Sequence, residues 1–314
     1  MAIERVSAIL FLLAAIAAPM LLSGFFIFQV TMLLVYAIAI MGLNLLTGFN
    51  GQFSLGHSAF YAIGAYAAAI LMDKFGIGYL WTLPLAGLIC FAVGFLFGFP
   101  ALRLEGTYLA LATFGLAVAT PQILKLTPLE HWTGGVQGVF VAKPNAAMGL
   151  PLTADQWLYY LTLSVFILLY ILARNLIGSR TGRALLAIRE NPIAAQSMGI
   201  NVSLYKTLTF GVSAAYTGVA GALGAIVIQF VAPDSFGFML SVTFLVGLVV
   251  GGIAWLPGAL IGAAFILFVP NFAEEISKGL SGAAYGVIMI LLMYVMPSGA
   301  GGIVQSALRA VRAR

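Results

Sequence analysis

A cluster of four polar residues stands out in a chain that is otherwise strongly apolar: Gln52, Ser54, His57 and Ser58. Amide, hydroxyl and imidazole groups can donate and accept hydrogen bonds. Inside a membrane, such groups mark solute pathways or join helices to one another. We therefore expect the cluster either to line or gate a path, or to satisfy backbone and helix-packing needs. Tyr108 and Thr113, two polar points on a later apolar run, join it as path candidates.

A metal site or an enzyme active site fits these residues poorly. The other histidine, His131, falls in a loop that we expect at the outer surface, and His57 has no obvious acid or nucleophile partner on its own helix. We expect neither a metal nor a cofactor bound to this chain. The phosphate-binding pattern Gly-x-x-x-x-Gly-Lys-Ser/Thr is absent, so ATP–Mg would have to be used by a partner protein.

A second group of residues occupies the basic segment 174–206. Thr181 is expected to cap a short helix that ends near Glu190, because Pro192 disfavours helical geometry at the residue before it. Asn191 then caps a second short helix with Pro192 at its first position, and Gly199 closes it. Asn201 is expected to start the next long helix.

The two short helices would expose small and apolar side chains, together with charges that can form salt bridges. This surface either rests on lipid headgroups or docks a soluble motor subunit in a helix-in-groove mode. The candidate coupling residues are Arg183, Ala184, Leu185, Ile188, Arg189, Glu190, Ala194, Ala195 and Met198.

The elements that position these groups are expected to be membrane helices. Of 314 residues, 62% are hydrophobic and only 7% are charged, too few to cover a water-facing surface. A membrane helix needs about 20 mostly apolar residues. We expect a single, all-α transmembrane domain over residues 1–314 with about ten spans, some of them discontinuous. The apolar runs are 7–23, 26–47, 55–72, 80–98, 106–124, 156–173, 207–230, 238–252, 255–270 and 283–297.

The orientation follows from the basic residues, which favour the cytoplasmic side. Segment 174–206 and the tail 298–314 are both basic, and ten spans put both termini in the cytoplasm. Residues 73–79 and 125–155 then lie outside. The net charge of +5 is assigned to topology, and nucleic acid is not expected as a partner. Residues 1–22 can also be interpreted as a cleaved signal peptide, and 238–270 either as two spans or as one broken helix.

Four motifs resemble those of branched-chain amino-acid ABC transporter permeases, over roughly residues 35–270. They are Gly-Leu-Asn-Leu-Leu-Thr-Gly-Phe-Asn-Gly-Gln-Phe-Ser-Leu-Gly-His-Ser from residue 42, Leu-Arg-Leu from 102 with Gly106 and Tyr108, Thr-Gly-Gly from 133, and the 179–206 segment with Gly-Arg-Ala-Leu, Ala-Ile-Arg-Glu-Asn and Met-Gly-Ile-Asn. The pattern is closer to the longer of the two permease types in that family.

The resemblance implies an importer in a bacterial inner membrane, driven by ATP through alternating access. It implies a second homologous permease, two cytosolic ATP-binding subunits and a periplasmic or extracellular binding protein as partners. Departures from the family pattern, such as Glu105 and Asn191-Pro192, leave urea, short amides or aromatic acids as alternatives to branched-chain or other hydrophobic amino acids. An ion-coupled secondary transporter is the rival class, but no Asp, Glu, Lys or Arg falls clearly inside a predicted span.

Overall fold

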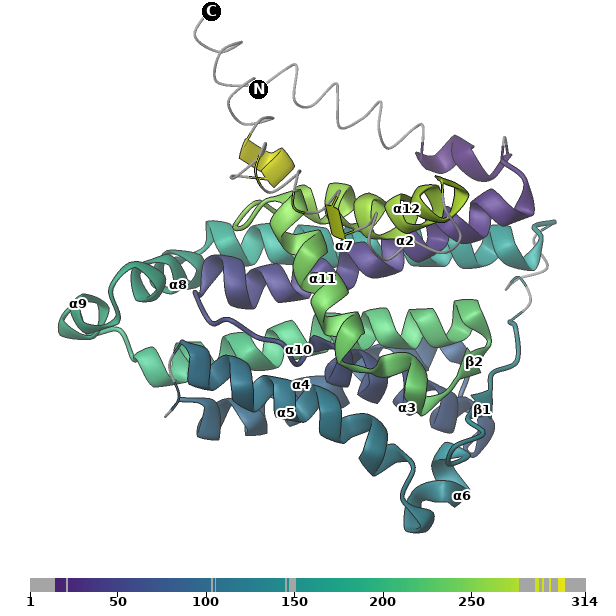
Figure 1. The fold of residues 1–314 in the computed structure, drawn as a ribbon, viewed down its shortest axis with the longest axis horizontal. Helices are drawn as coiled ribbons and strands as arrows, with labels where there is room; N and C mark the ends of the chain where they lie inside the picture. Colours follow the sequence, from purple (N-terminus) through teal and green to yellow (C-terminus); the bar gives the residue numbers. More distant parts are fainter. Residues whose placement is uncertain are drawn as a thin grey trace, which may run out of the picture.

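The computed structural model describes residues 15–20, 22–102, 104, 106–144, 146 and 151–276, with 286–287, 290, 294 and 299–302. Most long helices of this part lie roughly along one axis, and α11 crosses them at a steep angle (Figure 1). They are α2 (Gly24–Leu43), α3 (His57–Asp73), α4 (Tyr79–Ala101), α5 (Thr107–Leu124), α7 (Ala154–Gly178), α10 (Val202–Ile228), α11 (Phe238–Gly251) and α12 (Gly258–Ile276).

Short elements occupy the ends of this bundle. The π-helix η1 (Asn44–Phe49) continues α2, and α8 (Arg180–Glu190) and α9 (Pro192–Ser197) form an elbow between α7 and α10. The others are η2 (Thr127–Leu129), α6 (Glu130–Thr133), η4 (Pro233–Phe236), and the strands β1 (Val139–Phe140) and β2 (Phe230–Val231), which pair antiparallel with Val139 opposite Val231.

The helices alternate in direction, as the sequence predicts. At one end the rings of Phe75 and Trp132 stack 5.9 Å apart, and β1 pairs with β2. At the other end the side chain of Arg189 bonds to the backbone of η1. The loops predicted outside and the elbow predicted inside therefore lie at opposite ends (Figure 1). We call these the outer and the inner end; which of them faces the cytoplasm stays a prediction.

Six helices of the described part are long and apolar enough to cross a membrane. Helix α3 has 17 residues, about 25 Å at 1.5 Å per residue, and is shorter than a bilayer core of about 30 Å. The predicted count of ten is not tested, because most of run 7–23 and of run 283–297 lies outside the described residues. The all-α class is confirmed.

Residues 238–270 form two helices and not one broken helix. Residues 252–257 turn the chain between α11 and α12. A Cβ atom on Gly262 would lie 1.9 Å from the carbonyl oxygen of Gly247, and one on Gly258 would lie 2.2 Å from that of Gly251. The two helices therefore run antiparallel in backbone contact, which only glycine permits.

Helix α10 is the centre of the bundle. In its most apolar stretch 78% of the residues are buried, against 28% in α5 and α7. Glycines bring α3 and α4 against it: a Cβ on Gly64 would lie 2.0 Å from the carbonyl oxygen of Gly218, and one on Gly94 would lie 2.4 Å from the Cβ of Ala214. Because α5 and α7 are mostly exposed, they form the periphery, where lipid or another membrane protein can cover them.

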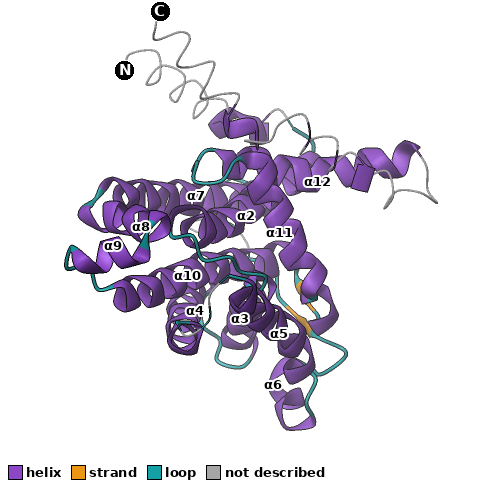
Figure 2. Cartoon of the chain, turned by 60° about the vertical axis from the view of Figure 1, so that its left-hand side comes forward, coloured by secondary structure: helices purple, strands orange, loops and turns teal. Residues whose placement is uncertain are grey.

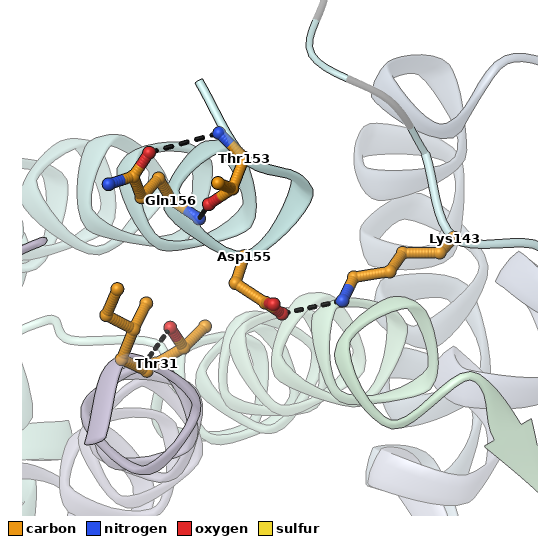
Figure 3. Close-up of polar contacts among 6 residues, drawn as sticks. Thr31, Lys143, Thr153, Asp155 and Gln156 are labelled. Atoms are coloured by element: carbon orange, nitrogen blue, oxygen red, sulfur yellow. Dashed lines mark hydrogen bonds and ion pairs between the residues drawn. The ribbon is translucent and has the colours of Figure 1, made fainter. Parts of the chain in front are cut away.

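The outer end of α7 is fixed by local bonds (Figure 3). Thr153 and Gln156 form a capping box, in which each side chain bonds the backbone N–H of the other residue at 3.3 and 3.0 Å. Lys143 pairs with Asp155 at 2.6 Å and ties the preceding loop to the first turn of the helix. The helix therefore begins two residues before the predicted run 156–173, and it extends five residues beyond it.

Candidate functional site

The predicted polar cluster lies at a break between α2 and α3. Helix α2 passes into the π-helix η1, and residues 50–56 then have no helical structure (Figures 1 and 2). Gly51 adopts a φ of +74°, a conformation that glycine takes without strain and that turns the chain back. Beyond it, Gln52 and Ser54 are buried whereas Phe53 is exposed, so alternate side chains face the interior.

The break ends deep inside the bundle. The His57 Nε2 atom, in the first residue of α3, lies 2.8 Å from the Ser213 Oγ atom. Ser213 lies eleven residues after the first residue of α10, which places it about 17 Å along that helix. Non-helical backbone at such depth is tolerated only where protein or a water-filled cavity satisfies its polar groups.

His57 joins three helices through hydrogen bonds. The Ser213 hydroxyl donates to the carbonyl oxygen of Gly42 on α2 at 2.6 Å, so its oxygen accepts a hydrogen bond from Nε2–H of His57. Nδ1 of His57 is then the acceptor for the Ser54 hydroxyl, 3.2 Å away. This assignment of the hydrogens gives a neutral imidazole, as suits a fully buried ring.

Two further side chains satisfy the backbone of the break. The Thr113 hydroxyl of α5 accepts a hydrogen bond from the Leu55 N–H at 2.9 Å. The Ser241 hydroxyl of α11 accepts one from the Ser58 N–H and donates to the Ser58 hydroxyl, both at 2.8 Å. The neighbouring helices therefore supply hydrogen-bond partners to those backbone groups of residues 50–58 that have no helical partner.

Gln52 sits at the start of the break. Its backbone N–H bonds to the carbonyl oxygen of Leu46 at 3.1 Å, and its carbonyl oxygen accepts the Thr47 hydroxyl at 3.0 Å. The Asn50 amide donates to the Gln52 side-chain oxygen at 2.6 Å. The side-chain oxygen of Asn50 is buried and has no partner within the described part of the chain. It is the acceptor that a solute, water or a rearranged helix would have to satisfy.

The fold thus brings together five of the six predicted path residues: Gln52, Ser54, His57, Ser58 and Thr113. Tyr108 lies apart from them, 70% exposed on the outward face of α5. In this conformation all five clustered residues are buried with protein partners, and their role in transport stays a proposal. Sequence reasoning missed Ser213 and Ser241; each is a single serine within a long apolar run, and that is the only signal that could have identified it.

The elbow forms as predicted, except at its first cap. The Ser179 hydroxyl, and not that of Thr181, caps α8 by accepting from the N–H groups of residues 181 and 182. Helix α7 runs on to Gly178, and with Ser179 as the cap α8 begins at Arg180, earlier than expected. Asn191 caps α9 through the Ala194 N–H at 3.0 Å, as predicted. Gly199 follows α9 with a φ of +84°, and Asn201 caps α10.

The predicted exposure of the elbow is wrong for four residues. Ala184, Leu185, Ile188 and Ala195 are buried against this chain's own helices. Helical periodicity aligns Ala184, Leu185 and Ile188 on one face of α8, and α8 packs on α7, η1 and α10. Ala195 belongs to α9, which packs on α8 and α10. Ala194 and Met198 are exposed as predicted, and the charged Arg183, Arg189 and Glu190 are exposed too. Ile193, which was not predicted, is 81% exposed, close to the 83% of Met198.

No group of three His, Cys, Asp or Glu side chains that could hold a metal occurs within the described residues. His57 bonds to two serines at depth, whereas His131 lies in α6 at the outer end. The chemistry that this site can supply is therefore hydrogen bonding at a helix break.

The chain is similar to known transport proteins over most of its length. Residues 25–297 match the family described as branched-chain amino acid transport system / permease component. The high-affinity branched-chain amino acid transport system permease protein LivM of Salmonella typhimurium is 35% identical, over 92% of this chain and 72% of LivM. LivM of Escherichia coli is 34% identical, over 94% of this chain and 74% of that protein. LivH of Salmonella typhimurium is 26% identical, over 84% of this chain and 90% of LivH. No solved structure matches.

Proposed function

Because this chain belongs to the family of branched-chain amino acid transport permeases, we propose that it is a membrane-spanning subunit of a binding-protein-dependent ABC importer for branched-chain or other hydrophobic amino acids. The observation that carries the proposal is the match to LivM over more than nine-tenths of the chain. The lower identity to LivH supports a subunit of the LivM type that pairs with a second, homologous permease.

The sequence and the elbow support separate roles for this chain and for the subunits that use ATP. Without a phosphate loop, this chain leaves ATP–Mg to two cytosolic ATP-binding subunits. Helix α9 offers them a small apolar surface, Ile193 and Met198, beside the exposed charges of Arg183 and Glu190. A short amphipathic helix with exposed anchors suits a groove on a partner protein. The elbow end is then cytoplasmic in a bacterial inner membrane.

Solute would pass near the break, between this chain and its partner permease. An outer binding protein delivers the solute to the loops around α6, and closure of the ATP-binding subunits moves the elbow and alternates access. In this cycle, hydrogen bonds break in one conformation and form again in the other among the buried polar residues Gln52, Ser54, His57, Ser58 and Thr113. A path built from hydroxyls, amides and apolar walls suits an uncharged or zwitterionic solute, because it holds no fixed net charge.

The test is reconstitution of the whole importer in proteoliposomes. The chain is combined with its partner permease, the ATP-binding subunits and the binding protein, and uptake of radiolabelled leucine, isoleucine and valine is measured with ATP inside. Uptake that needs both ATP and the binding protein is the expected result. Uptake of urea, a short amide or an aromatic acid in place of all three amino acids would change the substrate and retain the ABC assignment. Uptake driven by a proton or sodium gradient without ATP would refute the proposal.

A further inference from the structure

Arg189 connects the elbow to the end of η1 and to the start of the break. It lies next to the last residue of α8, and its Nη1 atom donates to the carbonyl oxygen of Gly48. Gly48 is buried in the last turn of η1, where helical carbonyls lack an intrahelical partner. A guanidinium donor makes this a charge-assisted bond, stronger than one between neutral groups.

The aliphatic stem of Arg189 makes a second contact. A Cβ atom on Gly51 would lie 3.0 Å from the Arg189 Cγ atom and 3.4 Å from its Cβ atom. The backbone at Gly51, where the chain turns with positive φ, therefore lies directly against this stem. Arg189 thus contacts the end of η1 with its head and the start of the non-helical segment 50–56 with its stem.

Asn44 links the other side of η1 to the turn between α11 and α12. Its side-chain amide donates to the Trp255 carbonyl oxygen at 3.1 Å, and its side-chain oxygen accepts from the Ala254 N–H at 2.9 Å. Ala254 has a φ of +59°, which costs energy for a residue with a Cβ atom, so this turn is held in place by its contacts. Asn44 is 1% exposed.

We propose that η1 transmits movement of the elbow to segment 50–56 during transport. Arg189 is the positioning residue that carries this movement from the elbow, and Asn44 holds the other side of η1 against the turn between α11 and α12. The inference rests on the proposed function. π-Helices are rare and frequently occur at functional sites. Because η1 lies between the Arg189 contact and the Asn44 contact, a rearrangement of η1 would carry movement from one to the other. Segment 50–56 carries Gln52 and Ser54, so its displacement alters the buried polar set.

The proposal separates the roles of two arginines on one helix. The side chains of Arg183 and Arg189 are both exposed, so both are available to a docked subunit, but Arg189 also donates a hydrogen bond to the backbone of η1. Replacing Arg189 with methionine keeps an unbranched stem over Gly51 but removes every donor. Arg180→Met is the matched control, because it removes the same charge from an exposed position in the first residue of the same helix.

The experiment uses the reconstituted importer, with each variant in the complete complex. Assembly, melting temperature, ATP hydrolysis and leucine uptake are measured together. Arg189→Met is expected to assemble and hydrolyse ATP, but its uptake per ATP falls about tenfold, the change that follows when one of two states loses a charge-assisted hydrogen bond. Arg189→Lys, which restores a charged donor, recovers part of the loss. Uptake per ATP equal to that of Arg180→Met would overturn the proposal, and so would a loss explained entirely by fewer assembled complexes.

A measurement without an Arg189 variant tests the same link. Spin labels on Ser197→Cys and Phe53→Cys report the elbow and the break, and Val136→Cys gives an outer reference; the native Cys90 is buried. On trapping ATP, the 197–53 distance should stay constant while the 53–136 distance changes. A 53–136 distance that stays fixed while the elbow moves would overturn the proposal. If the unmodified complex shows no ATP-driven uptake, the proposed function fails, and this inference fails with it.

Discussion

Replacing Ile193 and Met198 together with alanine should detach the ATP-binding subunits while the permease stays folded. Both side chains are more than 80% exposed in this chain, so truncating them removes little that its own fold uses. Each change removes three heavy atoms, worth about 0.8 kcal/mol per buried CH₂, or about 2 kcal/mol per residue if docking buries them completely. The pair then contributes up to about 4 kcal/mol, close to a thousandfold in Kd.

Binding is measured between the permease pair in nanodiscs and the purified ATP-binding subunits. Single variants should each weaken binding by up to about thirtyfold, and the double variant by the product if the sites are independent. Ile171→Ala and Met239→Ala are matched controls, because they remove the same atoms from exposed positions on α7 and α11, 49% and 73% exposed. Both controls should bind the ATP-binding subunits as the unmodified chain does.

The competing interpretation places the elbow on lipid headgroups. In that case the double variant would bind the ATP-binding subunits as tightly as the two controls do. Binding within twofold of the controls would therefore refute the docking surface, whatever happened to uptake. A weaker permease fold is excluded as the cause if the melting temperature of the permease pair is unchanged.

Three further predictions concern the framework around the site, each measured by thermal unfolding of the permease pair in detergent. Gly64→Ala should lower the free energy of unfolding by about 3 kcal/mol or more, because its Cβ would lie 2.0 Å from a backbone oxygen of α10. Gly115→Ala, whose Cβ would have nothing within 4 Å, should lower it little. Equal effects of the two changes would contradict the packing. Ser213→Ala should cost about 1–3 kcal/mol by leaving the Gly42 carbonyl and the His57 N–H unpaired, and Ser164→Ala, which loses only a bond within its own helix, is the control; a silent Ser213→Ala would contradict the network. Thr153→Ala should cost about 0.5–2 kcal/mol by removing the cap of α7, and no loss would mean that the capping box is not formed in solution.

The elbow shows which structural features can be predicted from neighbouring residues alone. Asn191, Pro192 and Gly199 each have strong positional preferences, so the second short helix and its limits follow from residues within the segment 191–199. The first cap was misplaced because Ser179 and Thr181 are both capping residues, and the choice depends on where α7 ends. An apolar stripe at Leu185 and Ile188 predicts a buried face, but periodicity does not say whether the chain itself or a partner covers it.

The polar break was recognisable as a cluster, but its partners were not. His57 pairs with a serine 156 residues away, and Ser58 with one 183 residues away. Such pairs depend on which helices meet at α10, and glycine contacts such as Gly64 on Gly218 decide that. A single serine in an apolar run is compatible with several partners, so the sequence alone does not select among them.

The structure also changes the choice between a path and a packing role for the cluster. Buried hydrogen-bonding groups in a membrane must be satisfied in every state, so residues that open a path must exchange partners and not simply lose them. Ser213 on α10 bonds to His57, and Ser241 on α11 bonds to Ser58. These two serines, on different helices, are the partners that such an exchange would involve. If α11 moves relative to α10, either His57 separates from Ser213 or Ser58 separates from Ser241. The side-chain oxygen of Asn50, which lacks a partner in the described part of the chain, is near enough in sequence to move with them. The residues that make packing contacts in this structure would then be the same residues that line the path when it opens.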